Sequence, residues 1–316
     1  MCSSDLATPA LKNLMSYFRD SRFSLLCSAS VAGLFKSDPN FAHVFVDDSK
    51  KYRARLWGMW KLARRIGRYD LSITFRNSFS CALLLKMTGS NIIVGSDMSA
   101  RRRLLTHPVR IDDSLHQAEI YNQLVNRYLG QDYPTGPTSL YLKEKKIFEK
   151  PTIGIAPGAT YGDAKRWGSE RFGEVAAALA DRYDILILGA VQERPISEEV
   201  ENELRSRGVH NYRNEVGKTT VEELAQLIAG LSLFISNDSG QMHIAGVFHI
   251  PTVAIFGPTI AAQTSPWKHA ALSIVRKDIP CAPCMKRTCP LKHHECMRQI
   301  QTEEVLAAVN RLVGPG

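Results

Sequence analysis

One stretch, residues 235–258, constrains the fold of this chain more than any other part. It reads I-S-N-D-S-G-Q-M-H-I-A-G-V-F-H-I-P-T-V-A-I-F-G-P and continues an apolar run that starts at Leu233. The pattern predicts a strand that ends in a polar turn, a short helix that begins at Ser239 and Gly240, and a second apolar strand. Such a turn directs free backbone N–H groups and the helix dipole at one point, which favours a phosphate ligand. An ordinary turn with an Asp or Ser helix cap explains the same residues equally well.

A second segment, residues 153–167, shifts this balance toward phosphate binding. It reads I-G-I-A-P-G-A-T-Y-G-D-A-K-R-W, so an apolar strand leads into a Pro-Gly turn. Thr160 and Lys165 then supply a hydroxyl donor and a cation, both suited to phosphate oxygens. The spacing differs from the P-loop pattern G-x-x-x-x-G-K-[ST], so a kinase or ATPase is not favoured. Taken alone, Lys165 and Arg166 would be a solvated pair at a helix start.

Short apolar segments alternate with longer amphipathic ones along the whole chain. We expect strands over residues 24–29, 43–46, 71–75, 91–94, 152–156, 184–189, 233–236, 252–256 and 272–275. We expect helices over residues 9–18, 52–67, 80–88, 114–129, 169–181, 196–207, 220–229, 239–247 and 302–312. This alternation predicts an α/β fold with parallel sheets. A length of 316 residues exceeds what one hydrophobic core usually organises, so we expect two Rossmann-like domains. Turn formers at 131–138 precede a charged stretch at 143–150, which places the domains at 1–148 and 149–316.

Charge is distributed unevenly between the two halves. Residues 1–150 hold 23 Lys and Arg against 13 Asp and Glu, whereas residues 151–316 hold 17 against 18. The basic clusters at 50–55, 61–68 and 101–103 alternate with aromatic and apolar residues. Nucleic acid, anionic lipid and phosphorylated glycolipid all suit such a surface, although any single cluster is more simply a solvated helix face. No run of eighteen apolar residues and no secretion signal is present, which indicates a cytoplasmic protein.

Four motifs together carry a family resemblance: A-P-G-A-T-Y-G-D-A-K-R-W, N-D-S-G-Q-M-H-I-A-G, I-F-G-P-T and C-x-P-C-x-K-R-x-C-P-L-x-H-H-x-C-M. They resemble the ADP-heptose:lipopolysaccharide heptosyltransferases of glycosyltransferase family 9, most closely the heptosyltransferase II branch. The resemblance implies a GT-B fold, in which two Rossmann-like domains face each other across a cleft. It also implies inverting transfer of heptose from ADP-heptose to the phosphorylated heptose–Kdo–lipid A inner core. The enzyme would need no metal for catalysis and would work peripherally at the inner face of the inner membrane.

The resemblance assigns roles on the donor side to several residues. Lys165 and Thr160 would contact the diphosphate, and the backbone around Ser239 and Gly240 would complete the cradle. Because a carboxylate beside a diphosphate would repel it, we expect Asp238 to hold sugar hydroxyls or to cap the helix.

Further candidates belong to the donor and acceptor sides. The resemblance assigns Glu193 to the ribose hydroxyls, although a bare Glu near a loop is usually a solvated charge. His243, one turn into its helix, would face the donor or pack as a backbone-bonded histidine. On the acceptor side we expect Asn77, Ser78 and Arg101, with a helix N-cap as the simpler explanation of the first two.

The general base is where the sequence departs from the family. Members place an aspartate about six residues before the proline of a Thr-Pro-Ala-Leu helix, and that count from Pro9 falls on Ser3, with Asp5 two residues later. Either Asp5 acts through a shifted turn, or the chain as written lacks its first strand and the base. We favour the second, which predicts weak or no activity and a first sheet without its central strand.

Four of the seven cysteines cluster as Cys281-x2-Cys284-x4-Cys289-x6-Cys296, with His293 and His294 inside the last interval. This spacing favours soft-metal coordination, by structural zinc or an iron–sulfur centre, over a disulfide in a reducing cell. A proline-rich loop with reduced thiols is the simpler alternative.

Two other function classes remain open from sequence alone. Another Rossmann-type sugar-nucleotide enzyme is disfavoured because no G-x-G-x-x-G follows a first strand. A basic anion-binding or membrane-binding protein without catalysis rests on the net charge of +9 alone, and no nucleic-acid-binding motif supports a nucleic-acid partner.

Overall fold

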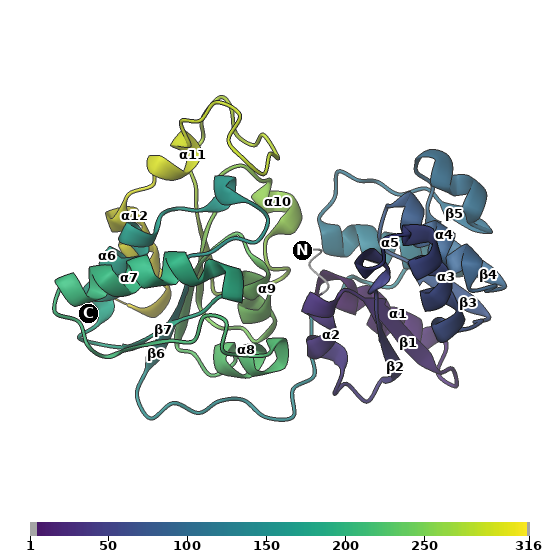
Figure 1. Cartoon of the computed structure of the whole chain (residues 1–316), viewed down its shortest axis with the longest axis horizontal. Coiled ribbons are helices and arrows are strands. Elements are labelled where there is room, and N and C mark those ends of the chain that lie inside the picture. Colours follow the sequence, from purple (N-terminus) through teal and green to yellow (C-terminus); the bar gives the residue numbers. More distant parts are fainter. Residues whose placement is uncertain (1–4, 315–316) are drawn as a thin grey trace. The chain divides into compact units, whose positions relative to one another are not determined.

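The computed structural model describes residues 5–314, which form two compact units (Figure 1). The N-terminal unit comprises Leu6–Tyr141, and the C-terminal unit comprises Asp5 and the chain from Leu142 onward. The division therefore falls a few residues before the boundary that we placed after residue 148. The charged stretch belongs to the C-terminal unit because the N–H of Lys146 donates to the carbonyl of Gln226 at 3.0 Å.

The C-terminal unit is built on one six-stranded parallel sheet with the order β11-β10-β9-β6-β7-β8. Its strands are β6 (Thr152–Ala156), β7 (Asp184–Ile187), β8 (Tyr212–Asn214), β9 (Leu233–Asn237), β10 (Thr252–Ile255) and β11 (Leu272–Val275). The chain begins in the middle with β6, builds outward to β8, and returns to β9 before building outward to β11. Strand order thus reverses between β6 and β9, which is the place where doubly wound folds bind ligands.

Helices connect these parallel strands, and two more follow the last strand. They are α6 (Ser169–Leu179), α7 (Arg194–Ser206), α8 (Val221–Ile228), α9 (Gly240–Val247), α10 (Ala261–Thr264), α11 (Glu295–Arg298) and α12 (Thr302–Val313), with short 3₁₀ turns η4 (Asp163–Lys165) and η5 (Val191–Glu193). The bounds expected for β6 and β11 are confirmed, and the other expected elements of this unit appear with ends shifted by up to two residues. The short elements β8, α10 and α11 were not expected.

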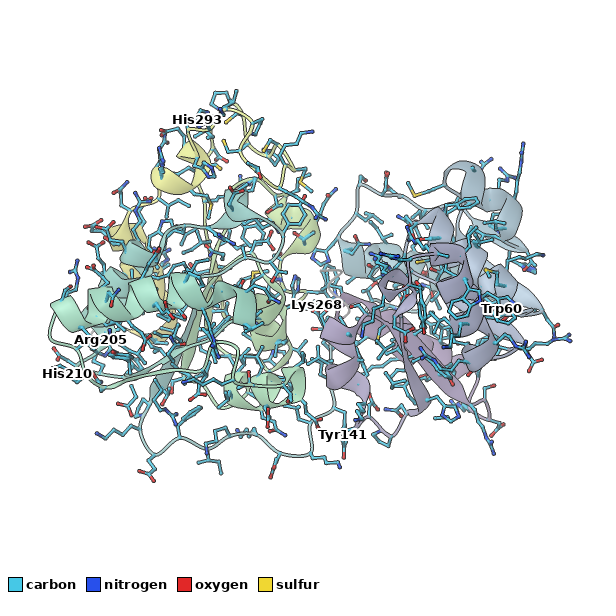
Figure 2. The ribbon with its side chains drawn as sticks, viewed as in Figure 1. Trp60, Tyr141, Arg205, His210, Lys268 and His293 are labelled. Atoms are coloured by element: carbon cyan, nitrogen blue, oxygen red, sulfur yellow. The ribbon has the colours of Figure 1, made fainter. Side chains whose placement is uncertain are left out.

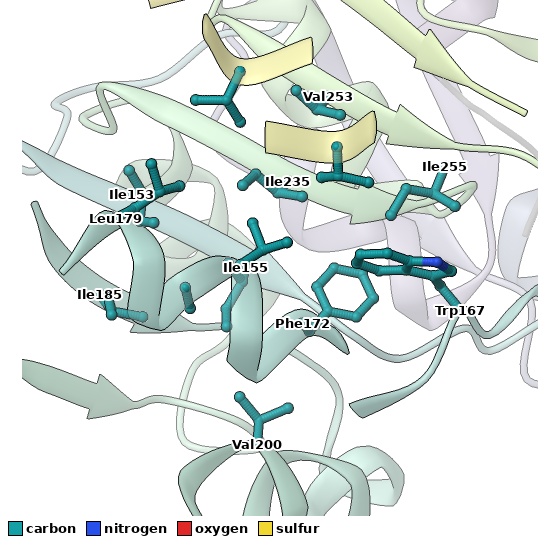
Figure 3. Packing of buried hydrophobic residues seen from close by; sticks show 14 of the residues in the cluster. Ile153, Ile155, Trp167, Phe172, Leu179, Ile185, Val200, Ile235, Val253 and Ile255 are labelled. Carbon is teal, nitrogen blue, oxygen red and sulfur yellow. The ribbon is translucent and has the colours of Figure 1, made fainter. Parts of the chain in front are cut away.

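The core of the C-terminal unit lies between the sheet and the helices α6, α7 and α12 (Figure 3). Ile153, Ile155 and Ile235 point from the central strands into this core and are fully buried. Trp167 and Phe172 pack edge to face beside them, with ring centroids 5.3 Å apart. The Trp167 indole N–H also donates to the carbonyl of Ile300 at 2.9 Å, which fixes the end of the loop that follows β6.

The N-terminal unit contains two parallel sheets, β1-β2 and β3-β4-β5. Its strands are β1 (Phe23–Cys27), β2 (Phe41–Val46), β3 (Leu71–Thr74), β4 (Ile92–Ser96) and β5 (His107–Val109). Its helices are α1 (Thr8–Tyr17), α2 (Ala29–Phe35), α3 (Arg55–Ile66), α4 (Phe79–Met87) and α5 (Gln117–Leu129), with 3₁₀ turns η1 (Asp5–Ala7), η2 (Ser49–Lys51) and η3 (Ser99–Leu104). Among residues 5–314 no strand joins the two sheets. The elements α2 and β5 were not expected. No helix within the described part of the chain is long and apolar enough to cross a bilayer.

Candidate functional site

The two loops singled out in the sequence meet at the reversal point between β6 and β9. Asn237, the last residue of β9, joins them with its side chain. Its Nδ2 donates to the carbonyl of Pro157 at 2.8 Å, and its Oδ1 accepts the Trp167 N–H at 3.1 Å. Sequence reasoning missed this role, because an Asn in an Asn-Asp-Ser-Gly turn gives no sign that its partners lie 70 or more residues away.

Lys165 and Asp238 form a buried ion pair at this point. The same Asp238 oxygen, Oδ2, accepts a hydrogen bond from Thr259 Oγ1 at 2.6 Å. The helix cap is Ser239, whose Oγ accepts the N–H of Met242 at 3.4 Å. Asp238 therefore does not cap helix α9. Instead it holds the ammonium of Lys165 beside the helix N-terminus, which neutralises the carboxylate that would repel a diphosphate.

A second cation that the sequence did not point to, Arg287, lies beside the loop after β6. Both cations contact the ring of Tyr161: Lys165 Nζ is 4.5 Å and Arg287 Cζ is 5.2 Å from its centroid. The N–H of Ala164 donates to the carbonyl of Arg287 at 3.1 Å, and a side chain at Gly162 would collide with that carbonyl. Arg287 is thereby fixed beside the loop, and exposed Thr160 lies on the same loop.

Glu193 lies in the turn that follows β7 and is only 8 % exposed, so the interpretation as a solvated surface charge is wrong. Its Oε2 accepts the N–H of Ala190 at 2.8 Å. A side chain at Gly158 would overlap the Glu193 carboxylate, so this glycine allows the turn after β6 to approach it. Burial raises the pKa of Glu193, partly offset by the Ala190 hydrogen bond and by Arg166.

His243 and Asp5 form a second buried contact in the C-terminal unit. The atoms His243 Nδ1 and Asp5 Oδ2 are 3.3 Å apart, and both side chains are more than nine-tenths buried. Burial alone would lower the pKa of His243, but the nearby Asp5 carboxylate, with a smaller contribution from Asp238, holds this pKa above its usual value. Asp5, which the sequence count placed too late for the base, thus contacts a histidine of helix α9.

The candidate acceptor residues lie at the ends of β3 and β4 in the N-terminal unit. Ser78 caps helix α4 by accepting the N–H of Cys81 at 3.3 Å, and Asn77 Oδ1 accepts Ser96 Oγ at 2.7 Å. Arg101 is 1 % exposed and donates to the carbonyls of Ser96 and Arg76. Its guanidinium is therefore bound to the protein itself, in contrast with the expected acceptor contact.

The four clustered cysteines line one small pocket together with His293 and His294. Ala164 and Pro258 also line it, so the pocket adjoins the loop that carries Lys165. Burial, followed by the neighbouring thiols of Cys281, Cys284 and Cys289, raises the pKa of Cys296 to about 11. The donors suit zinc chemically. As placed, however, no three His, Cys, Asp or Glu side chains among residues 5–314 are arranged to hold an ion.

Comparisons with known proteins identify the family of the chain. The family profile described as glycosyltransferase family 9 (heptosyltransferase) matches residues 59–295. The chain is 34 % identical over 317 residues to lipooligosaccharide heptosyltransferase 2 of Campylobacter jejuni, covering 98 % of this chain and 94 % of that protein. It is 28 % identical over 270 residues to lipopolysaccharide heptosyltransferase 2 of Escherichia coli, covering 78 % of this chain and 76 % of that protein.

Solved structures share the fold. The structure of E. coli ADP-heptose lps heptosyltransferase II superimposes with a TM-score of 0.81 at 22 % identity, covering 98 % of this chain and 94 % of that one. A glycosyltransferase of family 9 from Veillonella parvula gives a TM-score of 0.82 at 21 % identity, covering 98 % and 93 %. The profile match and the identity over nearly the whole chain show that this protein belongs to glycosyltransferase family 9, the heptosyltransferase family.

Proposed function

We propose that this family 9 enzyme transfers heptose from ADP-heptose to the heptose–Kdo–lipid A inner core of lipopolysaccharide, with inversion at the anomeric carbon. The observation that supports this most is the convergence of Lys165, Asp238 and the N-terminus of helix α9 at the reversal point of the sheet. A buried cation beside free helix N–H groups suits a diphosphate leaving group. Membership of the heptosyltransferase family indicates the class of reaction, which is glycosyl transfer.

The proposed reaction needs one proton acceptor and one group that stabilises the leaving group. The acceptor hydroxyl gives its proton to a carboxylate, and its oxygen forms a bond to the anomeric carbon. Although the count from Pro9 favoured a missing base, we propose Asp5 for this role because its carboxylate lies 3.3 Å from His243, in the unit that carries Lys165. The bond from that carbon to the diphosphate oxygen breaks, and ADP leaves with the electron pair. Lys165 offsets the charge that grows on the departing diphosphate.

A transfer assay tests this function. Purified protein is incubated with ADP-heptose and a defined heptose–Kdo–lipid A acceptor, and mass spectrometry measures addition of one heptose together with release of ADP. Product in which the new anomeric configuration is inverted supports the proposal. Absence of both transfer and ADP release, together with turnover that depends on added NAD, would favour another Rossmann-type sugar-nucleotide enzyme instead.

For Glu193 we propose the ribose contact, and Glu193→Gln separates this role from a structural one. The amide loses the charge that strengthens hydrogen bonds from ribose hydroxyls, so we expect the Kd for ADP to rise about 10- to 100-fold. The stability of the free protein should stay equal or increase, because the variant removes a buried carboxylate whose pKa is raised by desolvation. Calorimetric titration with ADP and thermal unfolding measure the two effects. Unchanged ADP affinity with lower stability would show that Glu193 is structural.

For the cysteine pocket we propose a structural zinc ion with no part in catalysis. The thiolates of Cys281, Cys284, Cys289 and Cys296 would hold it after these side chains move closer together than they lie in the structure. Protein purified without added metal should then contain about one zinc per chain by elemental analysis. Cys281→Ser combined with Cys284→Ser should lose the metal, whereas Cys27→Ser, outside the pocket, should retain it. Metal-free wild-type protein, or a metal content equal in the pocket variant and in the control, would contradict this proposal.

We further propose that the enzyme works at the cytoplasmic face of the inner membrane, where its lipid-anchored acceptor would lie. The support is the basic character of the first half of the chain, with 23 Lys and Arg against 13 Asp and Glu. An anionic acceptor and anionic lipid both attract such a surface.

A further inference from the structure

Helix α3 presents an unusual combination of side chains to solvent in the N-terminal unit. Leu56, Trp57 and Trp60 are 66 %, 52 % and 45 % exposed. Their spacing places them on one face of the helix, with exposed Lys61 and Arg64 beside them. We call these five residues the α3 face, and Figure 2 labels Trp60 on it.

Helix α3 already packs against the protein with the side opposite to the α3 face. Met59, Leu62 and Ala63 on the opposite side of the helix are buried and pack with Leu84 of helix α4. Two tryptophans and a leucine on the outer side therefore remain in water although the helix already has its core contacts. Exposed apolar groups that cluster in this way mark interaction sites more often than isolated ones do.

Cations interleave with the aromatic rings of this face. Lys61 Nζ lies 5.4 Å from the centroid of the Trp57 ring, and Arg64 Cζ lies 5.0 Å from that of Trp60. Within residues 5–314, neither cation has a carboxylate oxygen within ion-pair distance, whereas neighbouring Arg65 is paired with Asp48 at 3.1 Å. The positive charge of the face is thus available to an external anion.

The segment before the helix adds further charge. Gly58 has no side chain, and one there would collide with Ser49 and Tyr52, so the preceding turn η2 packs closely against α3. Exposed Lys50 and Lys51 of that turn are thereby held next to the helix. The result is an apolar strip bordered by cations on a rigid element.

We propose that the α3 face docks onto an anionic lipid surface, with Trp57 and Trp60 at the level of the headgroups and Lys61 and Arg64 among the lipid phosphates. Tryptophan suits this depth because its ring is apolar and its N–H is polar, and long cationic side chains reach phosphates from a shallow apolar strip. This inference rests on the proposed acceptor being membrane-anchored. It names the surface through which the enzyme would reach that acceptor.

Other occupants fit the face less well. A single-stranded nucleic acid also stacks on aromatic rings, but it does not account for exposed Leu56. A second copy of the chain would bring the same cations together, and their repulsion would oppose such a dimer. An anionic bilayer surface matches both the apolar strip and its positive border.

Vesicle sedimentation tests the proposal. Wild-type protein should bind vesicles of phosphatidylcholine with 30 % phosphatidylglycerol, and it should bind pure phosphatidylcholine vesicles roughly 10-fold or more weakly. Trp57→Ser combined with Trp60→Ser, and separately Lys61→Gln combined with Arg64→Gln, should each lower binding to the anionic vesicles by about 10-fold or more. Ile147→Ser combined with Lys150→Gln changes an exposed apolar residue and a nearby cation elsewhere and should leave binding unchanged.

Transfer assays on two acceptors separate this inference from the proposed function. With a delipidated acceptor in solution, the α3-face variants should match the wild type, which also shows that they are folded. With the full glycolipid embedded in anionic vesicles, they should be slower in parallel with their weaker binding. Vesicle binding that neither variant lowers, or a salt-sensitive preference for RNA over vesicles, overturns the inference. A wild-type enzyme that binds vesicles but transfers heptose to neither acceptor refutes the function and leaves the docking surface standing.

Discussion

Replacing Lys165 with methionine should lower kcat/KM for ADP-heptose by about 100- to 1,000-fold, the usual cost of removing one preorganised group that stabilises a growing charge. The ammonium lies in a buried position beside the N-terminus of helix α9, where its effect on a diphosphate is least screened by water. Methionine keeps the length of the side chain and removes only the charge. Steady-state rates with a saturating acceptor measure the effect.

The ion pair complicates the interpretation of this variant, and a second substitution resolves it. Lys165→Met leaves the Asp238 carboxylate buried without its cation, which costs about 3–5 kcal/mol of stability in comparable cases. Lys165→Met combined with Asp238→Asn removes both charges, so it should recover most of that stability in chemical denaturation without recovering activity. Arg166→Met, an exposed neighbour, should change the rate less than about fivefold. Activity that returns together with stability would show that Lys165 acts only in folding.

The sequence was most informative where backbone periodicity carries the signal. The buried strand β6 and the partly exposed edge strand β11 are short apolar runs bounded by polar residues or turn formers, and their predicted bounds are confirmed. Strands β5 and β8 were missed because each has three residues at a sheet edge, too few to show any period. Their pairing depends on the neighbouring strand, which is a tertiary property.

The sequence did not predict which side chains contact each other in the fold. Lys165 and Asp238 were both singled out, but their pairing joins residues 73 positions apart, and nothing local indicates it. For Arg101 the predicted partner was wrong. We expected Arg101, the first of three consecutive arginines, to contact the acceptor, yet in turn η3 its guanidinium donates to the carbonyls of Ser96 and Arg76. The charge of a residue therefore predicted what kind of group it binds, but it did not predict where in the fold that group lies.

Asp5→Asn is the second variant for which we expect a large effect, a loss of transfer of about 100- to 10,000-fold, as for removal of a general base. The amide is nearly isosteric with the carboxylate but cannot take the proton of the acceptor hydroxyl. Affinity for ADP should stay within about twofold, because the donor contacts proposed for Lys165 and Glu193 are intact. The assay is a single-turnover measurement with both substrates saturating, so that a binding defect does not appear as a rate defect.

This variant also decides between the two expectations for the start of the chain. By the count from Pro9, Asp5 lies two residues after the position of the family base. That count assumed that the turn before the helix has the same length as in the family. In the structure Asp5 is the first residue of the 3₁₀ turn η1, and its Oδ2 lies 3.3 Å from His243 Nδ1. If the wild type is active and Asp5→Asn is not, the shifted turn supplies the base. His243→Gln keeps the Asp5 carboxylate and removes its partner, so as a positioning change it should cost only about tenfold and should leave ADP affinity unchanged. An active wild type that tolerates Asp5→Asn within fivefold would place the base elsewhere, whereas a wild type that binds ADP but transfers nothing would support the view that the family base is missing from this chain.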